Sequence, residues 1–378
     1  MRLKRECGLL ADQGVISINN HPARTCLALI GLAAASVSAS AQEETATSPA
    51  ESPAEERSPW LLAPVLTTDP KLGTSLGALG GYIHYFDEKS RPSIFALMGQ
   101  YTNTDSIVAA LLAKTSFNED QQRLNAGFIY GDIKNDYDDY LGTGVPLKSN
   151  VGLHSIFARY LYRIRNEWFI GVQGLYQDTA IAGVTDFDQD LLDTLGITPY
   201  KSGGLGLVAY RDSRDSDTMP TRGGLFNLNN VAYRESLGGE DDYDVFRVEI
   251  RYFKSHGKGN VFAVRQLNHL TDDAPTQVRA AVQLRSYKIG QYNGEYMSSI
   301  EAEERLKLGE RWTATIFAGV ACTYGDGENC SNSDNIFPAA GAGVQYVLKP
   351  KERIVLNLEY AQGNGDNHGV YLKMGYAY

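Results

Sequence analysis

The residues best suited to catalysis in this chain are its histidines and serines, which could form a hydrolase triad with an acid. A serine hydrolase needs these three groups held together, often with the serine on a sharp strand-to-helix turn. Beyond residue 41 the histidines are His84, His154, His256, His269 and His368, and none lies in a recognisable nucleophile motif or a paired metal-binding motif. Triad members need not be neighbours in sequence, so a hydrolase stays open as an alternative. We nevertheless expect no enzymatic activity and no cofactor.

Two acidic segments, residues 132–140 and 186–193, could bind divalent cations. The spacing of Asp186, Asp188 and Asp190 suggests a calcium loop, but the glycine and the distal glutamate of such a loop are missing. We interpret both segments as solvated acidic loops, bridged by cations to lipopolysaccharide, and expect no dedicated metal site.

Two cysteines, Cys322 and Cys330, lie eight positions apart in the sequence CTYGDGENC. If the protein is exported, its compartment is oxidising and a disulfide that closes a small loop is the natural interpretation. Zinc binding is the alternative, but two cysteines with no nearby histidine make a poor zinc site.

Export is indicated by an apolar run at residues 26–37, which is too short to cross a bilayer as a helix. Arg24 precedes this run and Ala-Ser-Ala, a small-x-small cleavage pattern, follows it at residues 39–41. We therefore predict a signal peptide over residues 1–41. Residues 42–59, rich in Glu, Pro, Ala, Ser and Thr, are predicted to form a disordered periplasmic linker.

The charge of the mature chain argues against nucleic acid as a partner. The whole chain carries −10, and residues 1–41 hold four basic and two acidic residues, so the mature chain carries −10 − 2 = −12. A surface this acidic repels phosphate backbones.

Alternation of apolar and polar residues runs through residues 60–378 with no second linker, which predicts a single domain made of strands. In the segment 354–361, for example, Ile354, Leu356 and Leu358 alternate with polar residues such as Asn357 and Glu359. The strands are too many and too long for a soluble sandwich or propeller, which is the alternative. A membrane barrel turns the apolar face to lipid and the polar face to the lumen, and its closure leaves no sheet edge in lipid.

We predict an all-β fold, a 16-stranded antiparallel transmembrane β-barrel in the bacterial outer membrane. The predicted strands are 60–67, 71–86, 91–104, 106–118, 121–135, 149–165, 167–179, 201–212, 222–235, 242–256, 260–270, 298–308, 311–325, 335–348, 351–362 and 367–378. The even number is that of single-chain bacterial barrels. With the N-terminus in the periplasm, the long connections 136–148, 180–200, 271–297 and 326–334 all fall outside the cell.

Three stretches resemble the BamA/TamA-type barrel family, also called the bacterial surface antigen family. The first, YRDSRDSDTMPTRGG at 210–224, is similar to a family turn motif, and the second, PTQVRAAVQLRSYKIGQY at 275–292, is similar to the family's sixth outer loop. The third is the alternating C-terminal strand that ends on Tyr378. The resemblance covers roughly residues 60–378.

The resemblance implies roles for residues in each stretch. A charge-paired periplasmic turn would be built from Asp212, Arg214, Asp215, Pro220, Thr221 and Gly223. Val370, Leu372, Met374, Tyr376 and Tyr378 would form the C-terminal signal that the barrel-assembly machinery reads during biogenesis.

The sixth loop would fold into the lumen and be held there by Arg285, with Tyr287 beside it. A guanidinium in a confined lumen needs a carboxylate, and Glu303, on the strand face that carries Glu301 and Arg305, is the expected partner. The alternative is a solvated loop arginine.

The sequence also departs from the family. Ser286 stands where the family has glycine, and the segment ATIFAGVA, in the predicted strand 311–325, lacks the acidic residue that several members use to hold the arginine. Polypeptide-transport-associated domains, usual before the barrel, are not expected because only residues 42–59 precede it.

By resemblance, the function would be insertion or translocation of protein or lipid at the outer membrane, by lateral opening between the first and last strands. A passive channel or porin and a surface structural protein are the alternatives. Outer-membrane lipid and lipopolysaccharide are the expected contacts, and no partner protein can be named.

Overall fold

The computed structural model describes residues 59–69, 73–138, 140, 144–216, 219–349 and 354–374. The predicted signal peptide and, except for Pro59, the predicted linker lie outside these residues, so both stay predictions.

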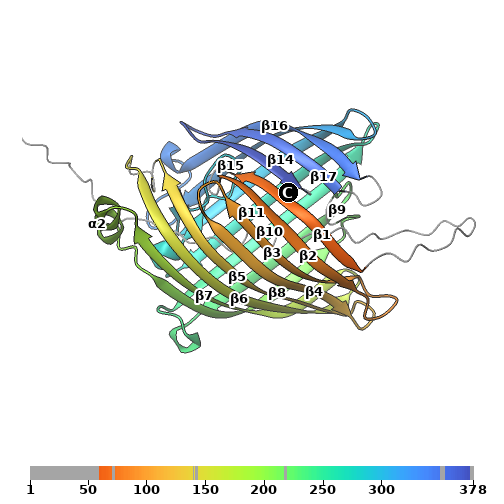
Figure 1. The fold of residues 1–378 in the computed structure, drawn as a ribbon, viewed down its shortest axis with the longest axis horizontal. Coiled ribbons are helices and arrows are strands. Elements are labelled where there is room, and N and C mark those ends of the chain that lie inside the picture. Colours follow the sequence, from red (N-terminus) through yellow and green to blue (C-terminus); the bar gives the residue numbers. More distant parts are fainter. Residues whose placement is uncertain are drawn as a thin grey trace, which may run out of the picture.

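Sixteen strands, each antiparallel to its neighbours in chain order, close into one barrel (Figure 1). Every predicted strand overlaps one of them, so the predicted 16-stranded antiparallel barrel is confirmed. The strands are β1 (Trp60–Asp69), β2 (Gly73–His84), β3 (Ser93–Thr102), β4 (Ile107–Phe117), β5 (Gln122–Tyr137), β6 (Leu147–Arg165), β7 (Trp168–Gly183), β8 (Tyr200–Asp212), β9 (Gly223–Tyr233), β10 (Tyr243–His256), β11 (Asn260–Asp272), β14 (Tyr296–Lys307), β15 (Trp312–Tyr324), β16 (Ile336–Lys349), β17 (Ile354–Gln362) and β18 (His368–Met374).

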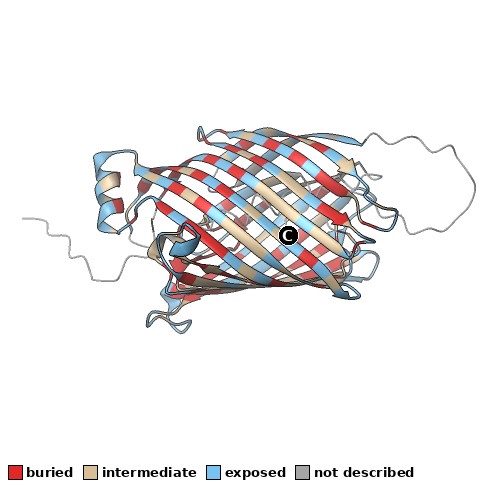
Figure 2. Cartoon of the chain, turned by 90° about the horizontal axis from the view of Figure 1, so that it is seen from below, coloured by how far each residue is buried: buried red, intermediate tan, exposed pale blue. Residues whose placement is uncertain are grey.

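Side chains alternate between the lumen and the outside along each strand, and Figure 2 shows the resulting bands of buried and exposed residues. On β14 the buried positions include Glu301, Glu303 and Arg305, whereas Ile300 and Leu306 are exposed. Polar residues thus face inward and apolar residues outward, the reverse of a soluble protein. The outward face of β14 is the one that the sequence predicted.

All 3 tryptophans of the chain lie on the outside near one end of the barrel. Trp60 packs against Tyr82, Trp168 against Phe226 and Trp312 against Tyr346, with ring centroids 5.1, 5.7 and 4.6 Å apart. Aromatic girdles of this kind mark the level of the lipid headgroups.

The two ends of the barrel differ in their connections. One end, called here the short-turn end, carries the tryptophans and turns such as 118–121, 166–167 and 257–259. The opposite, long-loop end carries 184–199 and 273–295. This asymmetry is the one predicted for periplasmic turns and outer loops.

The loop between β7 and β8 contains a helix, α2 (Asp186–Thr194), which corrects the expectation of an acidic loop there (Figure 1). Thr185 and Asp188 form a capping box, so one of the three aspartates considered as cation ligands instead satisfies backbone N–H groups. The other acidic segment is corrected too, because residues 132–137 extend β5. Within the described residues, no group of three or more His, Cys, Asp or Glu side chains is arranged to hold a metal ion.

No helix in the described part of the chain has the length and apolar character required to cross a membrane.

The junction between β1 and β18 is described only in part. All 10 residues of β1, from Trp60 to Asp69, pair with β2, whereas the described residues show a single register pair with β18, Thr68 with Leu372. Pro64, in the middle of β1, has no N–H to donate to either neighbour. The described part of β18 ends at Met374, so it covers only the Asp69 end of this junction, which is called the seam here.

Candidate functional site

The residues between β11 and β14, 273–295, fold back into the barrel and are called loop 6 here. Two short strands inside it, β12 (Ala280–Ala281) and β13 (Asn293–Gly294), pair with each other. Val282, Leu284 and Tyr287 are buried in a core cluster. That cluster includes Leu267, Met297, Ala321, Phe337 and Ala339 of β11, β14, β15 and β16. Loop 6 is thus packed on the inner wall of the barrel.

Arg285 lies at the centre of this packing and contacts three carboxylates. Its Nη2 and Nε donate to the two carboxylate oxygens of Glu301 at 2.7 and 3.1 Å. Its Nη1 donates to Glu303 at 2.9 Å and to Glu359 of β17 at 3.2 Å. The guanidinium also stacks on Phe317 of β15, with Cζ 3.4 Å from the ring centroid. The side chain is 9% exposed, so these contacts are shielded from water.

The structure therefore brings Arg285 to Glu303, the partner named from the sequence, and adds three groups that were not named as partners: Glu301, Glu359 and Phe317. Glu359 was assigned to the polar face of its strand but not to the arginine. Phe317 occupies the strand on which several family members carry an acid. The carboxylates come instead from β14 and β17, and the Phe317 ring stacks on the flat face of the guanidinium.

Glu303 joins Arg285 to a second arginine. Arg305 Nε donates to the other oxygen of Glu303 at 2.9 Å, and its Nη1 donates to the carbonyl of Pro220 at 2.8 Å. Pro220 belongs to the turn between β8 and β9. A continuous set of charged contacts thus runs from loop 6 to a turn at the short-turn end.

Several turn residues named from the sequence form ion pairs or hydrogen bonds with one another. Arg214 forms a bidentate pair with Asp212, at 2.8 and 2.9 Å. Asp215 accepts from the backbone N–H of Thr221 at 2.8 Å and from its hydroxyl at 2.5 Å. Gly223 has φ +96°, a conformation that favours glycine.

Loop 6 also contacts the last strands of the barrel. The backbone N–H of Ser286 donates to the hydroxyl of Tyr371 on β18 at 2.7 Å. The hydroxyl of Tyr287 donates to the carbonyl of Pro338 at 2.7 Å and accepts from the N–H of Asn364 at 2.9 Å. Loop 6 is therefore bonded to the C-terminal side of the seam.

Ser286 is strained where it stands. Its φ is +92°, and its buried hydroxyl has no hydrogen-bond partner in the described part of the chain. We expect Ser286→Gly to raise the free energy of unfolding by about 1–2 kcal/mol, because glycine adopts this φ freely and removes an unsatisfied hydroxyl. Urea unfolding of the purified barrel would measure the change. Ser331→Gly, at an exposed residue without positive φ, is the control and should give no gain; equal stability of Ser286→Gly and wild type would contradict the strain argument.

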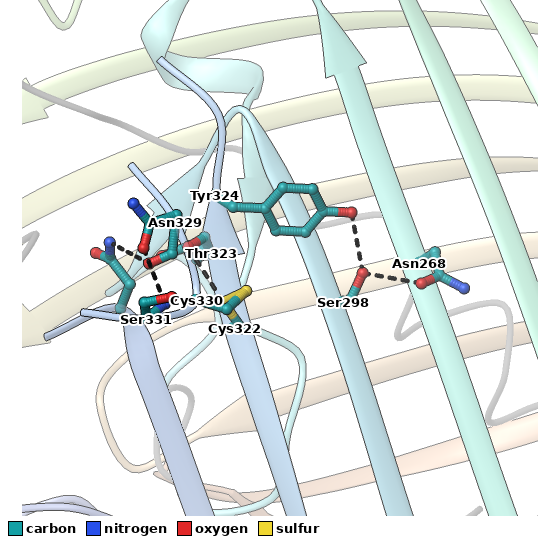
Figure 3. The surroundings of a disulfide bond; sticks show 9 residues. Asn268, Ser298, Cys322, Thr323, Tyr324, Asn329, Cys330 and Ser331 are labelled. Atoms are coloured by element: carbon teal, nitrogen blue, oxygen red, sulfur yellow. Dashed lines mark hydrogen bonds between the residues drawn. A yellow bond between two sulfur atoms is a disulfide. The ribbon is translucent and has the colours of Figure 1, made fainter. Parts of the chain in front are cut away.

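The disulfide between Cys322 and Cys330 is present, with Cα atoms 5.8 Å apart (Figure 3). It closes the loop after β15 at the long-loop end, where Asp326 also pairs with Arg279 of loop 6. Nearby, Tyr324, Ser298 and Asn268 are hydrogen-bonded across three strands.

Removing this disulfide should leave the barrel folded. A short ring restricts the unfolded chain by about 2–3 kcal/mol at most, and here it orders only a surface loop. We expect Cys322→Ser/Cys330→Ser to keep the faster gel mobility of unheated barrel, with a melting temperature lowered by only a few degrees. Loss of the fast-migrating form would show that the loop is needed for folding.

The C-terminal residues are only partly described. Val370 is exposed on the outer face of β18 and Leu372 lies on the same face. The side chain of Met374 and residues Tyr376 and Tyr378 lie outside the described part, so the assembly signal stays a prediction.

One serine needs a correction. Ser75 stands in a Gly-x-Ser-x-Gly sequence, Gly73–Gly77, so the expectation that the chain lacks this nucleophile pattern is wrong. It lies inside β2 in regular register with β3, and its hydroxyl faces Gln100 at 3.5 Å. The strand-to-helix turn of a nucleophile elbow is not formed there.

No protein-family model and no curated protein sequence matches the chain. Among solved structures it is similar to BamA from Haemophilus ducreyi lacking POTRA domains 1–3, at 12% identity and TM-score 0.58, over 85% of this chain and 71% of that one. CdiB from Acinetobacter baumannii matches at 9% identity and TM-score 0.59, over 83% and 60%. CdiB from Escherichia coli matches at 11% and 0.56, over 85% and 63%. The chain thus spans 60–71% of the length of these structures.

Identities this low show the fold alone. The chain has the fold of BamA-type outer-membrane barrels, which confirms the fold that the resemblance implied.

Proposed function

We propose that this barrel inserts or translocates protein or lipid at the outer membrane, by separating β1 from β18. The observation that carries the proposal is Pro64 in the middle of β1, which has no N–H to donate to β18, the strand that β1 meets at the register pair of Thr68 with Leu372. A strand interrupted by proline separates from its neighbour more easily than a fully paired strand, and the freed edges could pair with an incoming strand or admit lipid.

The contacts of loop 6 support this proposal over a passive channel. Loop 6 fills part of the lumen and is bonded to β14, β16, β17 and β18 by Arg285, Ser286 and Tyr287. The C-terminal strand of the seam, β18, is therefore bonded to loop 6 inside the barrel. In contrast, β1 is held by its pairing with β2. In our proposal β1 and β2 move and β18 stays in place.

A cross-link across the seam tests the proposal. Thr68→Cys/Leu372→Cys joins the two strands at their register pair, and Thr67→Cys/Ser75→Cys, a register pair of β1 and β2, is the matched control. We expect the oxidised seam cross-link to abolish the growth or envelope phenotype that the wild-type gene rescues in a deletion strain, and reduction to restore it. The control should stay active when oxidised. Full activity of the cross-linked seam, together with single-channel conductance in planar bilayers, would instead indicate a channel.

A further inference from the structure

The charge that the lumen presents to water is unevenly distributed. On the β14–β17 wall, Glu301, Glu303 and Glu359 are 0–7% exposed because Arg285 and Arg305 cover them. On the opposite wall the arginines are more accessible. On β5 and β6, the exposed fractions of Arg123 and Arg163 are 11% and 32%.

A cavity lies on this basic wall at the short-turn end. It is lined by residues of β4, β5, β6 and β8 and of the connection before β3. The charged residues among them are Arg91, Lys114, Arg123, Arg159 and Asp212, four cations and one carboxylate.

The acids around the cavity are already engaged. Asp212 is held by both donors of Arg214. Asp120, behind Arg123, accepts two bonds from Arg123 at 2.7 Å and a further bond from Arg163. The cavity therefore keeps an excess of positive charge.

Arg159 contributes to that excess. Its guanidinium is bound by neutral amides alone, Gln173 Oε1 at 2.7 and 3.1 Å and Asn227 Oδ1 at 3.4 Å, and no carboxylate of the described residues forms an ion pair with it. Arg247 of β10 likewise donates to a neutral amide, Gln283 Oε1, at 3.0 Å. A partly buried guanidinium without a counter-charge is unfavourable, and the amides fix its orientation without neutralising it.

We propose that this cavity binds a small multivalent oxyanion of the phosphate class, with Arg159 as its principal ligand and Lys114 and Arg123 beside it. Guanidinium groups suit phosphate because two parallel N–H donors meet two oxygens. Lys114, Arg123 and Arg159 are on the lumenal side of their strands, so the anion enters from water in the barrel and not from lipid. This site is separate from the seam and from loop 6, and it does not depend on the proposed function.

Calorimetric titration of the full-length barrel in detergent tests the site. Inorganic phosphate should bind at neutral pH with one site per chain, and sodium chloride at equal ionic strength should give only dilution heat. Arg159→Gln should weaken phosphate binding at least tenfold, and Arg159→Lys should weaken it less. Arg211→Gln is the matched control, because Arg211 lies on β8 at the same end but is 45% exposed and paired with Glu167; it should bind as wild type does.

Two results would overturn the proposal: phosphate heats that do not exceed dilution in the wild type, or unchanged affinity in Arg159→Gln. Heat-modifiable gel mobility shows whether each variant is folded. If Arg159→Gln does not fold, Lys114→Gln decides, because this exposed side chain can be changed with little loss of packing. Its affinity should fall at least threefold, and wild-type affinity would overturn the proposal.

Discussion

Arg285→Ala is expected to lower the free energy of unfolding by about 3–5 kcal/mol and to release loop 6 from the barrel wall. Removing the guanidinium leaves Glu301, Glu303 and Glu359 buried with one fewer cation among them. Arg305, bonded to Glu303 at 2.9 Å, would be the remaining arginine in that set of contacts. Buried carboxylates without a counter-charge repel one another, and loop 6 loses the bonds that hold its centre.

Unfolding in urea, limited proteolysis and single-channel recording would measure the effect. We expect a lower midpoint, new cleavage within residues 273–295 and a larger conductance. Arg279→Ala is the matched control: it removes another loop-6 arginine, but one whose partner Asp326 is 37% exposed, so the loss should be about 1 kcal/mol or less.

Arg285→Lys should rescue only part of the loss. Lysine keeps the charge but cannot contact three carboxylates through a planar fork or stack flat on Phe317. If Arg285→Ala leaves the urea midpoint, the cleavage pattern and the conductance unchanged, loop 6 is not held by this arginine, and the role that the resemblance implied does not apply to this chain.

The fold followed from sequence because a membrane barrel repeats one simple rule. Lipid outside and polar lumen inside impose alternation on every strand, and the segment 354–361 shows it clearly. Helix α2 was missed because its aspartates were considered as ligands. The sequence Thr185-Asp186-Phe187-Asp188 does contain a capping-box signal, an acid three residues after a threonine.

Site residues were harder to predict when they came from distant strands. Glu303 follows loop 6 directly in the chain and could be named. Glu359 is 74 residues from Arg285, and its contact depends on how far each strand is staggered around the barrel, which alternation does not determine. The same limit applies to the bond between Arg305 and Pro220, 85 residues apart.

Gly223→Ala is expected to lower the free energy of unfolding by at least about 2 kcal/mol, because positive φ and a steric clash act together. A Cβ at Gly223 would lie 2.1 Å from the backbone oxygen of Ser213. The turn has to move to relieve this clash. That movement breaks the hydrogen bonds from the N–H and the hydroxyl of Ser213 to the carbonyl of Gly224, at 2.9 and 3.1 Å.

A second glycine, Gly257, distinguishes the effect of positive φ from the effect of a steric clash. Gly257, in the turn between β10 and β11, has φ +54° but a Cβ there would meet no atom closer than 3.8 Å. Gly257→Ala should therefore lower the free energy of unfolding only by the cost of placing alanine at positive φ, about 1 kcal/mol. Equal losses for the two variants in urea would show that the clash at Gly223 is absorbed without moving the turn.

Movement of this turn should also weaken the charged contacts in the lumen. Pro220 lies in the same turn, and its carbonyl is the acceptor for Arg305, which shares Glu303 with Arg285. If Gly223→Ala displaces Pro220, the bond from Arg305 to the Pro220 carbonyl is already weakened. The double variant Gly223→Ala/Arg305→Ala should then lose less free energy of unfolding than the two single variants lose together. We expect a coupling free energy of about 0.5–1 kcal/mol or more from the double-mutant cycle in urea. Additive losses would mean that the turn and the loop-6 contacts are energetically independent, even though a hydrogen bond joins them.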